Sequence, residues 1–274
     1  MIRDRVLRGE VAEAARVLAR LGLVTAFGHV SARAGDSMLI TPAADLAGVT
    51  AASVIEVPLA ARLLPAGAPA EAWAHLALYR ARPDAAAIAR AQPAAALAVA
   101  AVTTAMVPVH GQAAWLGESV PVYDDAALLR SADRAERAAS CLPAGEALLL
   151  RGNGALTLGA TPGLAVARMW LLAAACDVYL AALAASGASP VTTMSDGEIA
   201  SWRAVGGELL PRLWEHLRSG LGSAGPESAG PGPGEEQGQG QPGDHRRPPA
   251  PRVMPLDLRE EREPHGDAPD RKQT

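Results

Sequence analysis

The sequence predicts an α/β fold in which short strands alternate with helices. Three observations support this prediction. Short apolar runs recur along the first 221 of the 274 residues, stretches with helical periodicity separate them, and hairpin signals lie among them. Hydrophobic residues make up 49% of the chain, so a substantial core is expected, but only five Trp, three Tyr and one Phe are present. The core must therefore consist mainly of Ala, Leu and Val.

The predicted elements follow from local patterns. Apolar residues from Val6 to Leu21 repeat at three and four residues, which indicates a helix that ends at Gly22. The residues on either side of Ala34-Gly35-Asp36 form a hairpin pattern, with strands at 29–33 and 37–41. Further strands are predicted at 54–57, 85–89, 107–109, 120–123, 147–150 and 155–158. Further helices are predicted at 69–82, 93–102, 124–140, 162–187 and 195–220.

The last part of the chain has a different composition. From Gly222 to Pro251, 15 of 30 residues are Gly or Pro, and most of the others are polar. Such a segment cannot bury enough apolar surface to offset the entropy that is lost on ordering. The sequence therefore predicts one folded domain over residues 1–221, followed by a disordered, Gly/Pro-rich and charged tail over residues 222–274.

Charge and cysteine content exclude several classes of protein. The chain carries 25 Lys and Arg against 29 Asp and Glu, so its net charge of −4 is not that of a polycation that binds nucleic acid through phosphates alone. Cys141 and Cys176 lack CxxC spacing, which favours a reducing compartment. No secretory signal peptide is readable, and the longest uncharged apolar run, Pro93–Val109, is shorter than a membrane span. We expect a cytoplasmic protein without nucleic-acid or membrane partners.

Four segments occur in a characteristic order, at Gly28–Arg33 with Leu39–Pro42, Glu71–Asp84, Val107–Gly111 and Leu149–Gly154. Together they resemble the class II aldolase/adducin family, whose members include metal-dependent aldolases of sugar phosphates. The resemblance implies a three-layer α/β/α sandwich with a central, mostly antiparallel sheet. It also implies a ring-like homotetramer with active sites at subunit interfaces.

The metal-binding positions of the family differ in this chain. The resemblance places the usual ligands at an H-x-H after the strand that follows Arg82-Pro83-Asp84, and at a third His before a Gly late in the sheet. At these positions the chain has Arg90, Gln92 and Asn153. A guanidinium cannot coordinate a divalent cation, and amides are poor ligands for zinc. We therefore expect no metal and no cofactor, although the family typically uses zinc or another divalent metal.

The resemblance also bears on the substrate. Aldolases of the family often have Gly-Asn where this chain has Gly28-His29, and Ser-Gly where it has Ala43-Ala44, so a phosphorylated sugar does not fit. The fuculose-phosphate type has a Tyr proton donor after the position of His110, where this chain has Gly111. We expect a small, unphosphorylated carbonyl or carboxylate substrate, similar to the aromatic acids on which some members act in specialised metabolism.

Glu71 and Arg90 are the candidate catalytic residues. In the family, the position of Glu71 carries the acid/base that moves the proton on the carbon next to the carbonyl; the alternative is an ordinary Glu in the first turn of a helix. Arg90 could grip a carboxylate or stabilise an enolate, which is the electrostatic task of zinc in the aldolases; the alternative is a strand-end Arg paired with a surface acid. We interpret His75, four residues after Glu71, as a structural residue beneath the site.

Five further residues are candidates for substrate binding, namely His29, Thr41, Gln92, His110 and Asn153. His29 and His110 each adjoin a Gly, and each could be a proton shuttle, a hydrogen-bond donor or a structural residue. Gln92 and Asn153 could hydrogen-bond a substrate oxygen, although the Asn-Gly pair is also a strong hairpin signal. Thr41 belongs to the Thr-Pro segment that carries the resemblance.

Three functions agree with these observations. The first, which we adopt as a hypothesis, is a lyase-type enzyme that cleaves a C–C bond or decarboxylates through an enolate, with Glu71 moving the proton and Arg90 holding the enolate. The second is a non-catalytic, adducin-like binding and assembly module that keeps the fold without the metal. The third is a metal enzyme with remodelled ligands, drawn from Glu71 and the histidines His29, His75 and His110.

Overall fold

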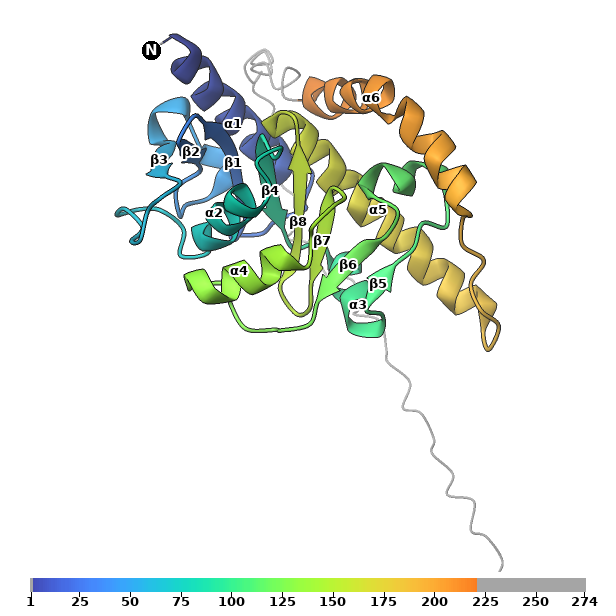
Figure 1. Cartoon of the computed structure of the whole chain (residues 1–274). Helices are drawn as coiled ribbons and strands as arrows, with labels where there is room; N and C mark the ends of the chain where they lie inside the picture. Colours follow the sequence, from blue (N-terminus) through green and yellow to red (C-terminus); the bar gives the residue numbers. More distant parts are fainter. Residues whose placement is uncertain (1, 221–274) are drawn as a thin grey trace, which may run out of the picture. The chain divides into compact units, whose positions relative to one another are not determined.

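The computed structural model describes residues 2–220 (Figure 1), so the tail predicted at 222–274 lies outside the described residues. The α-helices are α1 Ile2–Arg20, α2 Ala72–Ala81, α3 Ala94–Val102, α4 Ala132–Ser140, α5 Pro162–Ser186 and α6 Asp196–Ser219. The strands are β1 His29–Ala34, β2 Ser37–Ile40, β3 Ile55–Pro58, β4 Ala87–Ala91, β5 Ala105–Met106, β6 Val120–Tyr123, β7 Ala147–Leu150 and β8 Gly154–Gly159. Short 3₁₀ helices are η1 Leu46–Gly48, η2 Ala51–Ser53 and η3 Gly111–Leu116.

The eight strands form one mixed sheet in the order β3-β2-β1-β4-β8-β7-β6-β5. β6 and β7 pair in parallel, whereas all other neighbours are antiparallel. β1 and β2 are the predicted hairpin, in which Ala34 lies opposite Ser37 and Gly35 has a φ of 61°, as a tight hairpin turn requires. The predicted, mostly antiparallel sheet is thus confirmed, and β4 and β8 occupy its centre.

Helices cover both faces of the sheet, which makes the predicted three-layer sandwich (Figure 1). Residues of α1, α3, α5 and α6 share one core cluster, and residues of α2 and α4 share the other. Alternation along β4 separates the two sides: its alanines at 87, 89 and 91 belong to the α5 side, whereas Ile88 belongs to the α2 side. Arg90 alternates with these alanines and therefore faces α2. The small alanine side chains let α5 lie close to the sheet.

Several predicted elements have different bounds in the structure, and two of these differences bear on the site. β4 covers 87–91 rather than 85–89, so Arg90 lies inside a strand instead of closing it. The helix predicted at 124–140 begins only at Ala132. In the preceding loop the Asp125 carboxylate accepts a hydrogen bond from Ala127 N at 2.9 Å, and such a local turn competes with helix formation.

The strand predicted at 107–109 is wrong. β5 is the two-residue strand Ala105–Met106, and the chain then runs as a loop to η3. Pro108 has no N–H to offer a neighbouring strand, and its carbonyl accepts a hydrogen bond from Met194 N at 2.9 Å. The apolar run at 107–109 is therefore a loop that is hydrogen-bonded to the segment before α6.

α5 is the one helix among residues 2–220 that is long and apolar enough to cross a membrane by length and composition alone. Its most apolar 18-residue window has a mean hydropathy of 1.7. The same helix contacts β4, β8, α1 and α3, and its first half is buried from Ala165 to Cys176 with few exceptions. Only 28% of that window is buried, so these contacts account for apolar residues in the first half of α5 and not for those in its second half.

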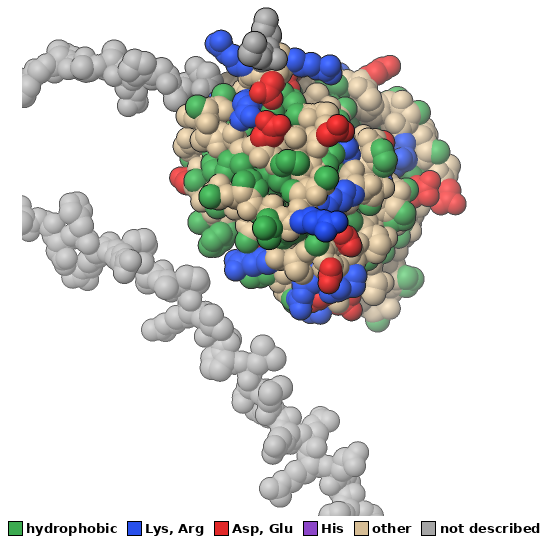
Figure 2. All heavy atoms as spheres, turned by 60° about the vertical axis from the view of Figure 1, so that its left-hand side comes forward, with side chains coloured by type: hydrophobic (Ala, Val, Ile, Leu, Met, Phe, Trp, Pro, Cys, Tyr) green, Lys and Arg blue, Asp and Glu red, His purple; other side chains and the backbone are tan. Residues whose placement is uncertain are grey.

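The surface carries charges of both signs. Figure 2 shows acidic and Arg side chains interspersed over one face, with apolar side chains gathered between them. This mixture agrees with the small net charge of −4. Among the exposed large apolar side chains is the only Phe of the chain, Phe27, which is 65% exposed.

α6 begins at a capping box, which we predict to be worth about 1 kcal/mol. Ser195 Oγ accepts from Glu198 N at 3.4 Å, and Ser195 N donates to Glu198 Oε2 at 2.8 Å. Ser195→Ala should therefore lower the free energy of unfolding by about 1 kcal/mol in urea denaturation. Ser201→Ala, at an exposed position inside the same helix, is the control and should change it by less than about 0.5 kcal/mol. Equal effects of the two changes would show that the cap contributes nothing.

Candidate functional site

A cavity of about 680 Å³ lies at the end of β4, a size typical of small-molecule sites. Its lining comes from the loop before β1, the loop between β2 and η1, the segment that leads into α2, the end of β4, the loop before α4 and the β7–β8 turn. Five of the seven predicted site residues line it, namely His29, Glu71, Arg90, Gln92 and Asn153. The fold thus brings together side chains that are up to 124 residues apart in the sequence (153 − 29).

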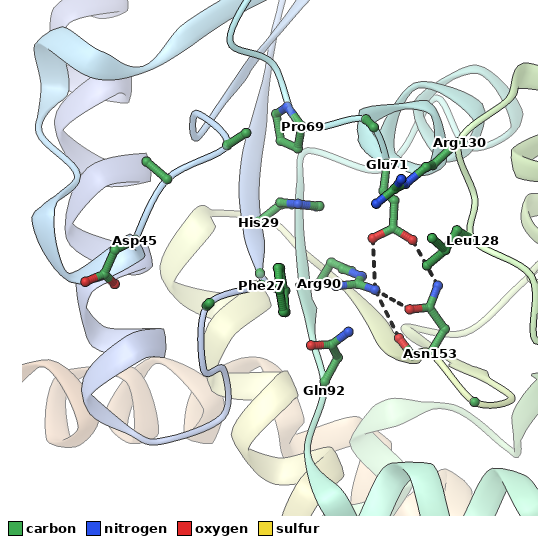
Figure 3. A pocket seen from close by; sticks show the side chains of 16 residues that line it. Phe27, His29, Asp45, Pro69, Glu71, Arg90, Gln92, Leu128, Arg130 and Asn153 are labelled. Carbon is green, nitrogen blue, oxygen red and sulfur yellow. Dashed lines mark hydrogen bonds and ion pairs between the residues drawn. The ribbon is translucent and has the colours of Figure 1, made fainter.

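Glu71, Arg90 and Asn153 form a closed cluster in the cavity (Figure 3). Arg90 Nη2 lies 3.0 Å from Glu71 Oε2, and it donates to Asn153 Oδ1 at 2.5 Å and to the Asn153 carbonyl at 3.2 Å. Asn153 Nδ2 donates to Glu71 Oε1 at 2.9 Å. Both carboxylate oxygens are therefore held in fixed positions. The side chains of Arg90 and Glu71 are only 2% and 12% exposed.

The local structure explains how these three side chains meet. Glu71 is the N-cap residue of α2, but its side chain makes no capping bond and turns to Arg90 instead. Arg90 lies opposite His29 of β1 and Leu156 of β8, in the middle of the sheet. Asn153 ends the β7–β8 turn, in which its N–H donates to the carbonyl of Leu150 at 2.9 Å. The hairpin predicted from Asn-Gly is confirmed, but its turn is formed by residues 151–153, and Asn153 does not adopt a positive φ.

Arg90 is the buried cation of the site. Burial lowers its pKa, while the adjacent Glu71 carboxylate raises it in part. An arginine stays charged throughout the useful pH range, so the pair is an ion pair. The Gln92 amide, with its oxygen turned towards Arg90, accepts from Nη1 at 3.3 Å and from Nη2 at 3.2 Å. The alternative of a strand-end Arg paired with a surface acid is wrong, because the partner of Arg90 is the nearly buried Glu71.

These residues do not fit the divalent metal that the family typically uses. The guanidinium of Arg90 occupies the centre of the cluster, and its positive charge would repel a cation there. Glu71 Oε2 and Asn153 Oδ1 already accept from Arg90, and Glu71 Oε1 accepts from Asn153 Nδ2. Within residues 2–220, no group of three His, Cys, Asp or Glu side chains is placed to hold a metal ion. A remodelled site built from Glu71 and the histidines is therefore not assembled in this part of the chain.

His29 and His75 are neighbouring buried imidazoles, with ring centroids 5.7 Å apart. Burial is the largest cause that lowers the pKa of each: that of His75 falls to about 3, and that of His29 falls well below 6.5. Both rings are thus neutral near pH 7. Below about pH 6.5 the two imidazoles take up protons in the unfolded chain but stay neutral in the folded chain. The pair therefore makes the fold less stable as the pH falls from about 6.5 towards 3.

Thr41 and His110, the other two predicted residues, do not line the cavity of the single chain. Thr41 is fully buried, and its hydroxyl oxygen accepts from Val30 N at 3.2 Å, so it braces the β1–β2 hairpin. His110 precedes η3, beside Gly111, where the ring of Trp202 leaves no room for a side chain. A role of either residue in substrate binding stays a prediction.

Among the lining residues that sequence reasoning missed, four have a large apolar or a charged side chain. Phe27 and Leu128 are 65% and 45% exposed and provide apolar surface. Arg130 is exposed and forms no ion pair with any side chain in 2–220. Asp45 also lines the cavity, but its carboxylate accepts from Ala47 N at 3.0 Å and caps η1. Phe27 adjoins the Gly28-His29 segment, which was a usable signal, whereas Leu128 and Arg130 lie in a loop that was predicted as a helix.

Comparisons with known proteins agree with this fold. The model of the class II aldolase and adducin N-terminal domain matches residues 9–180, which is more than half of the chain. Human beta-adducin is 30% identical over 159 residues, which are 56% of this chain but only 22% of beta-adducin. The chain thus spans less than a quarter of the length of this relative.

Solved structures of the same kind superimpose on the chain. L-fuculose-1-phosphate aldolase from Thermus thermophilus is 27% identical, with a TM-score of 0.61 over 69% of this chain and 100% of the aldolase. An aldolase II superfamily protein from Pseudomonas syringae, 22% identical, shares the fold with a TM-score of 0.69 over 81% of this chain and 94% of that protein. The chain belongs to the family of class II aldolase and adducin N-terminal domains.

Proposed function

We propose that this chain is a lyase-type enzyme that forms an enolate next to a carbonyl group, and that it thereby makes or breaks a C–C bond or decarboxylates its substrate. The observation that supports this most strongly is the Glu71 carboxylate in the cavity. It is oriented by Arg90 through one oxygen and by Asn153 through the other. A base that is held in place before the substrate arrives loses little entropy in the reaction.

The chemistry follows from the positions of the two charges. In the condensing direction, Glu71 accepts a proton from the carbon next to the carbonyl, the C–H electrons form a C=C bond, and the carbonyl oxygen becomes the enolate oxyanion. The enolate carbon then attacks an aldehyde carbon, the carbonyl of the enolate re-forms, and the aldehyde oxygen takes up the proton that Glu71 had accepted, which returns Glu71 to its carboxylate form. The negative charge thus moves from Glu71 to the enolate, and the positive charge of Arg90, 3.0 Å from Glu71, stabilises it in both places.

The lining of the cavity favours a substrate with an apolar part and an anionic group, and the absence of a phosphate from that substrate stays a prediction from the sequence. Phe27 and Leu128 offer exposed apolar surface, while Arg130 offers a cation that is not paired within residues 2–220. A planar guanidinium of this kind can bind a carboxylate through two hydrogen bonds. The cytoplasmic location and the homotetramer stay predictions.

A binding and assembly module is the second candidate function. The observation that favours it is the completeness of the cluster, because Glu71 and Arg90 satisfy each other without a substrate. The 30% identity to part of beta-adducin agrees with such a module. In that case the ion pair would join the start of α2 to the sheet and would have no chemical task.

Exchange of hydrogen for deuterium tests the proposed enzyme without knowledge of its natural substrate. An enzyme that forms enolates should catalyse exchange at the carbon next to the carbonyl in D₂O, and ¹H NMR can follow this with pyruvate, hydroxyacetone and dihydroxyacetone. Glu71→Gln keeps the size of the side chain and removes the base, so we expect exchange to slow by about 10²-fold. Glu118→Gln, which changes an exposed Glu outside the cavity, should leave the rate unchanged.

Other outcomes distinguish the competing functions. A folded Glu71→Gln protein that exchanges as fast as the wild type would contradict the role of Glu71. A wild type that exchanges none of the three compounds would favour the binding module. Dialysis against EDTA should leave the rate unchanged, because Arg90 occupies the centre of the site; a loss that zinc restores would favour the remodelled metal enzyme.

A further inference from the structure

A line of buried polar side chains runs from the cavity into the layer between α2 and the sheet. Along α2, Glu71, His75 and Tyr79 are spaced by four residues and share one face. Ser31, two residues after His29 on β1, contacts the second and third of them. Its Oγ lies 2.7 Å from His75 Nδ1 and 2.9 Å from the Tyr79 hydroxyl. Ser31, His75 and Tyr79 are all at most 1% exposed, so each polar atom needs a partner inside the protein.

The direction of these hydrogen bonds follows from counting protons. If the Tyr79 hydroxyl donates to Ser31 Oγ, then Ser31 donates its own proton to His75 Nδ1, and no hydroxyl proton is left unpaired. In the reverse direction the Tyr79 proton would be buried without an acceptor among the described residues, which costs about 1–3 kcal/mol. The first direction leaves one buried N–H, that of His75 Nε2, without a hydrogen bond, but this group adjoins the ring of His29, and we adopt this direction for the inference. His75 Nδ1 is then an acceptor, and the proton of the neutral ring sits on Nε2.

The ring of His29 lies next to the ring of His75, which carries this proton on Nε2. His75 Nε2 and His29 Nδ1 are both buried without a partner in the part of the chain that the structure describes, and they belong to adjacent rings. An N–H group next to a bare ring nitrogen attracts it, whereas two N–H groups would repel each other. Because His75 carries its proton on Nε2, His29 is favoured as the tautomer with a bare Nδ1. Its own proton then sits on Nε2.

The Nε2 edge of His29 is the one that reaches the cavity. The side chain lines the cavity beside Arg90, which lies directly across from it in the β1–β4 pairing (Figure 3). Its Nδ1 is buried, and no hydrogen bond within residues 2–220 engages its Nε2. A second positive charge beside the buried Arg90 would be unfavourable, so a neutral N–H donor suits this position.

We propose that His29 is a neutral hydrogen-bond donor for the oxyanion that forms in this cavity, and that the chain Tyr79–Ser31–His75 sets its Nε2–H tautomer. The role in binding an enolate rests on the proposed function, whereas the tautomer does not. Under this proposal Arg90 supplies charge next to Glu71, and His29 supplies a directed hydrogen bond from the neighbouring strand. His75, Ser31 and Tyr79 are positioning residues, because they act through His29.

The tautomers can be read directly from the folded protein. Long-range ¹H–¹⁵N correlation spectra of protein with ¹⁵N-labelled histidine distinguish Nε2–H, Nδ1–H and doubly protonated rings. At pH 7 we expect both His29 and His75 to be neutral with the proton on Nε2. Ser31→Ala removes the donor to His75 Nδ1, so both histidines should then show mixed tautomers. A doubly protonated His29, or His29 with its proton on Nδ1, in the wild type would overturn the proposal.

Binding of oxalate tests the donor itself, since this planar dianion resembles the enolate of a 2-oxo acid. We expect His29→Ala to bind oxalate about tenfold more weakly than the wild type in NMR titrations, which matches the loss of one hydrogen bond. His29→Gln keeps a neutral N–H donor and should bind within about threefold of the wild type. Equal binding by the wild type and His29→Ala, including no binding by either, would overturn the proposal.

These outcomes are independent of the test of the proposed function. The tautomers and oxalate binding require no turnover, so they can be as expected even if Glu71→Gln retains full exchange. Conversely, catalysed exchange together with an Nδ1–H tautomer of His29 would overturn this inference alone. In an active enzyme, His29→Ala should lower kcat in the exchange assay, and His29→Gln should restore most of it.

Discussion

Replacing Arg90 with alanine should lower the free energy of unfolding by about 3–5 kcal/mol, the range for removing one partner of a buried ion pair. Arg90 is 2% exposed, and its loss would leave the Glu71 carboxylate, which is 12% exposed, without its cation. It would also remove the donor to Asn153 Oδ1. Urea denaturation monitored by circular dichroism measures the change.

Two controls separate this effect from the mere loss of a charge. Arg134→Ala removes one partner of a pair whose side chains are 40% and 35% exposed and 3.9 Å apart, so it should cost less than about 1 kcal/mol. The double change Arg90→Met with Glu71→Gln removes both charges, and it should recover most of the stability lost in Arg90→Ala. If Arg90→Ala lowers the free energy of unfolding no more than Arg134→Ala does, then Arg90 and Glu71 do not form the buried ion pair described above.

Replacing Gly154 with alanine should lower the free energy of unfolding by about 3 kcal/mol or more, because backbone strain and a steric clash add. Gly154 starts β8 with a φ of 92°, in the region that disfavours side chains. A Cβ atom there would also collide with the carbonyl oxygen of Ala91 and lie 2.9 Å from Gln92 Cα. Backbone atoms cannot move aside as a flexible side chain can, so β4 and β8 would have to separate.

Gly22→Ala is the matched control for the strain alone. Gly22 has a φ of 68°, but nothing lies within 4 Å of the position of its Cβ. This change should therefore cost only about 1–2 kcal/mol in the same denaturation experiment. Because Gly154 adjoins Asn153, Gly154→Ala should also slow deuterium exchange under the proposed function. If both alanine variants are equally stable, the close approach of β8 to Ala91 is contradicted.

Much of the candidate site could be predicted from the sequence, because the resemblance placed Glu71, Arg90, Gln92 and Asn153 near one another. The cavity includes all four. The local patterns also indicated α2, where polar residues recur every four positions, and β1, where they recur every two positions. The pairing of these two rows into one buried line was not predicted, because it depends on how α2 crosses β1.

The prediction from sequence failed where the preference of a segment for a helix or strand competes with a turn that a side chain stabilises, or with a hydrogen bond to another part of the chain. The loop before α4 has helical composition, but Asp125 stabilises a turn within it, and the loop carries Leu128 and Arg130 to the cavity. Thr41 and His110 lie within the segments that carry the resemblance. Their side chains do not line the cavity of the single chain, because Thr41 bonds to Val30 and His110 precedes η3, and their role in substrate binding stays a prediction.

By itself, the sequence determined the class of fold, the hairpin, most of the helices and the absence of imidazoles at the three expected metal positions. These properties depend on residue identity, periodicity and turn chemistry, which are local. Only the tertiary structure decided the state of the charges, because electrostatic energy depends on distance and burial. Arg90 was expected to meet a substrate or a surface acid, and the fold instead places it 3.0 Å from Glu71. His29 and His75 became a buried neutral pair for the same reason: the sheet and α2 remove them from water.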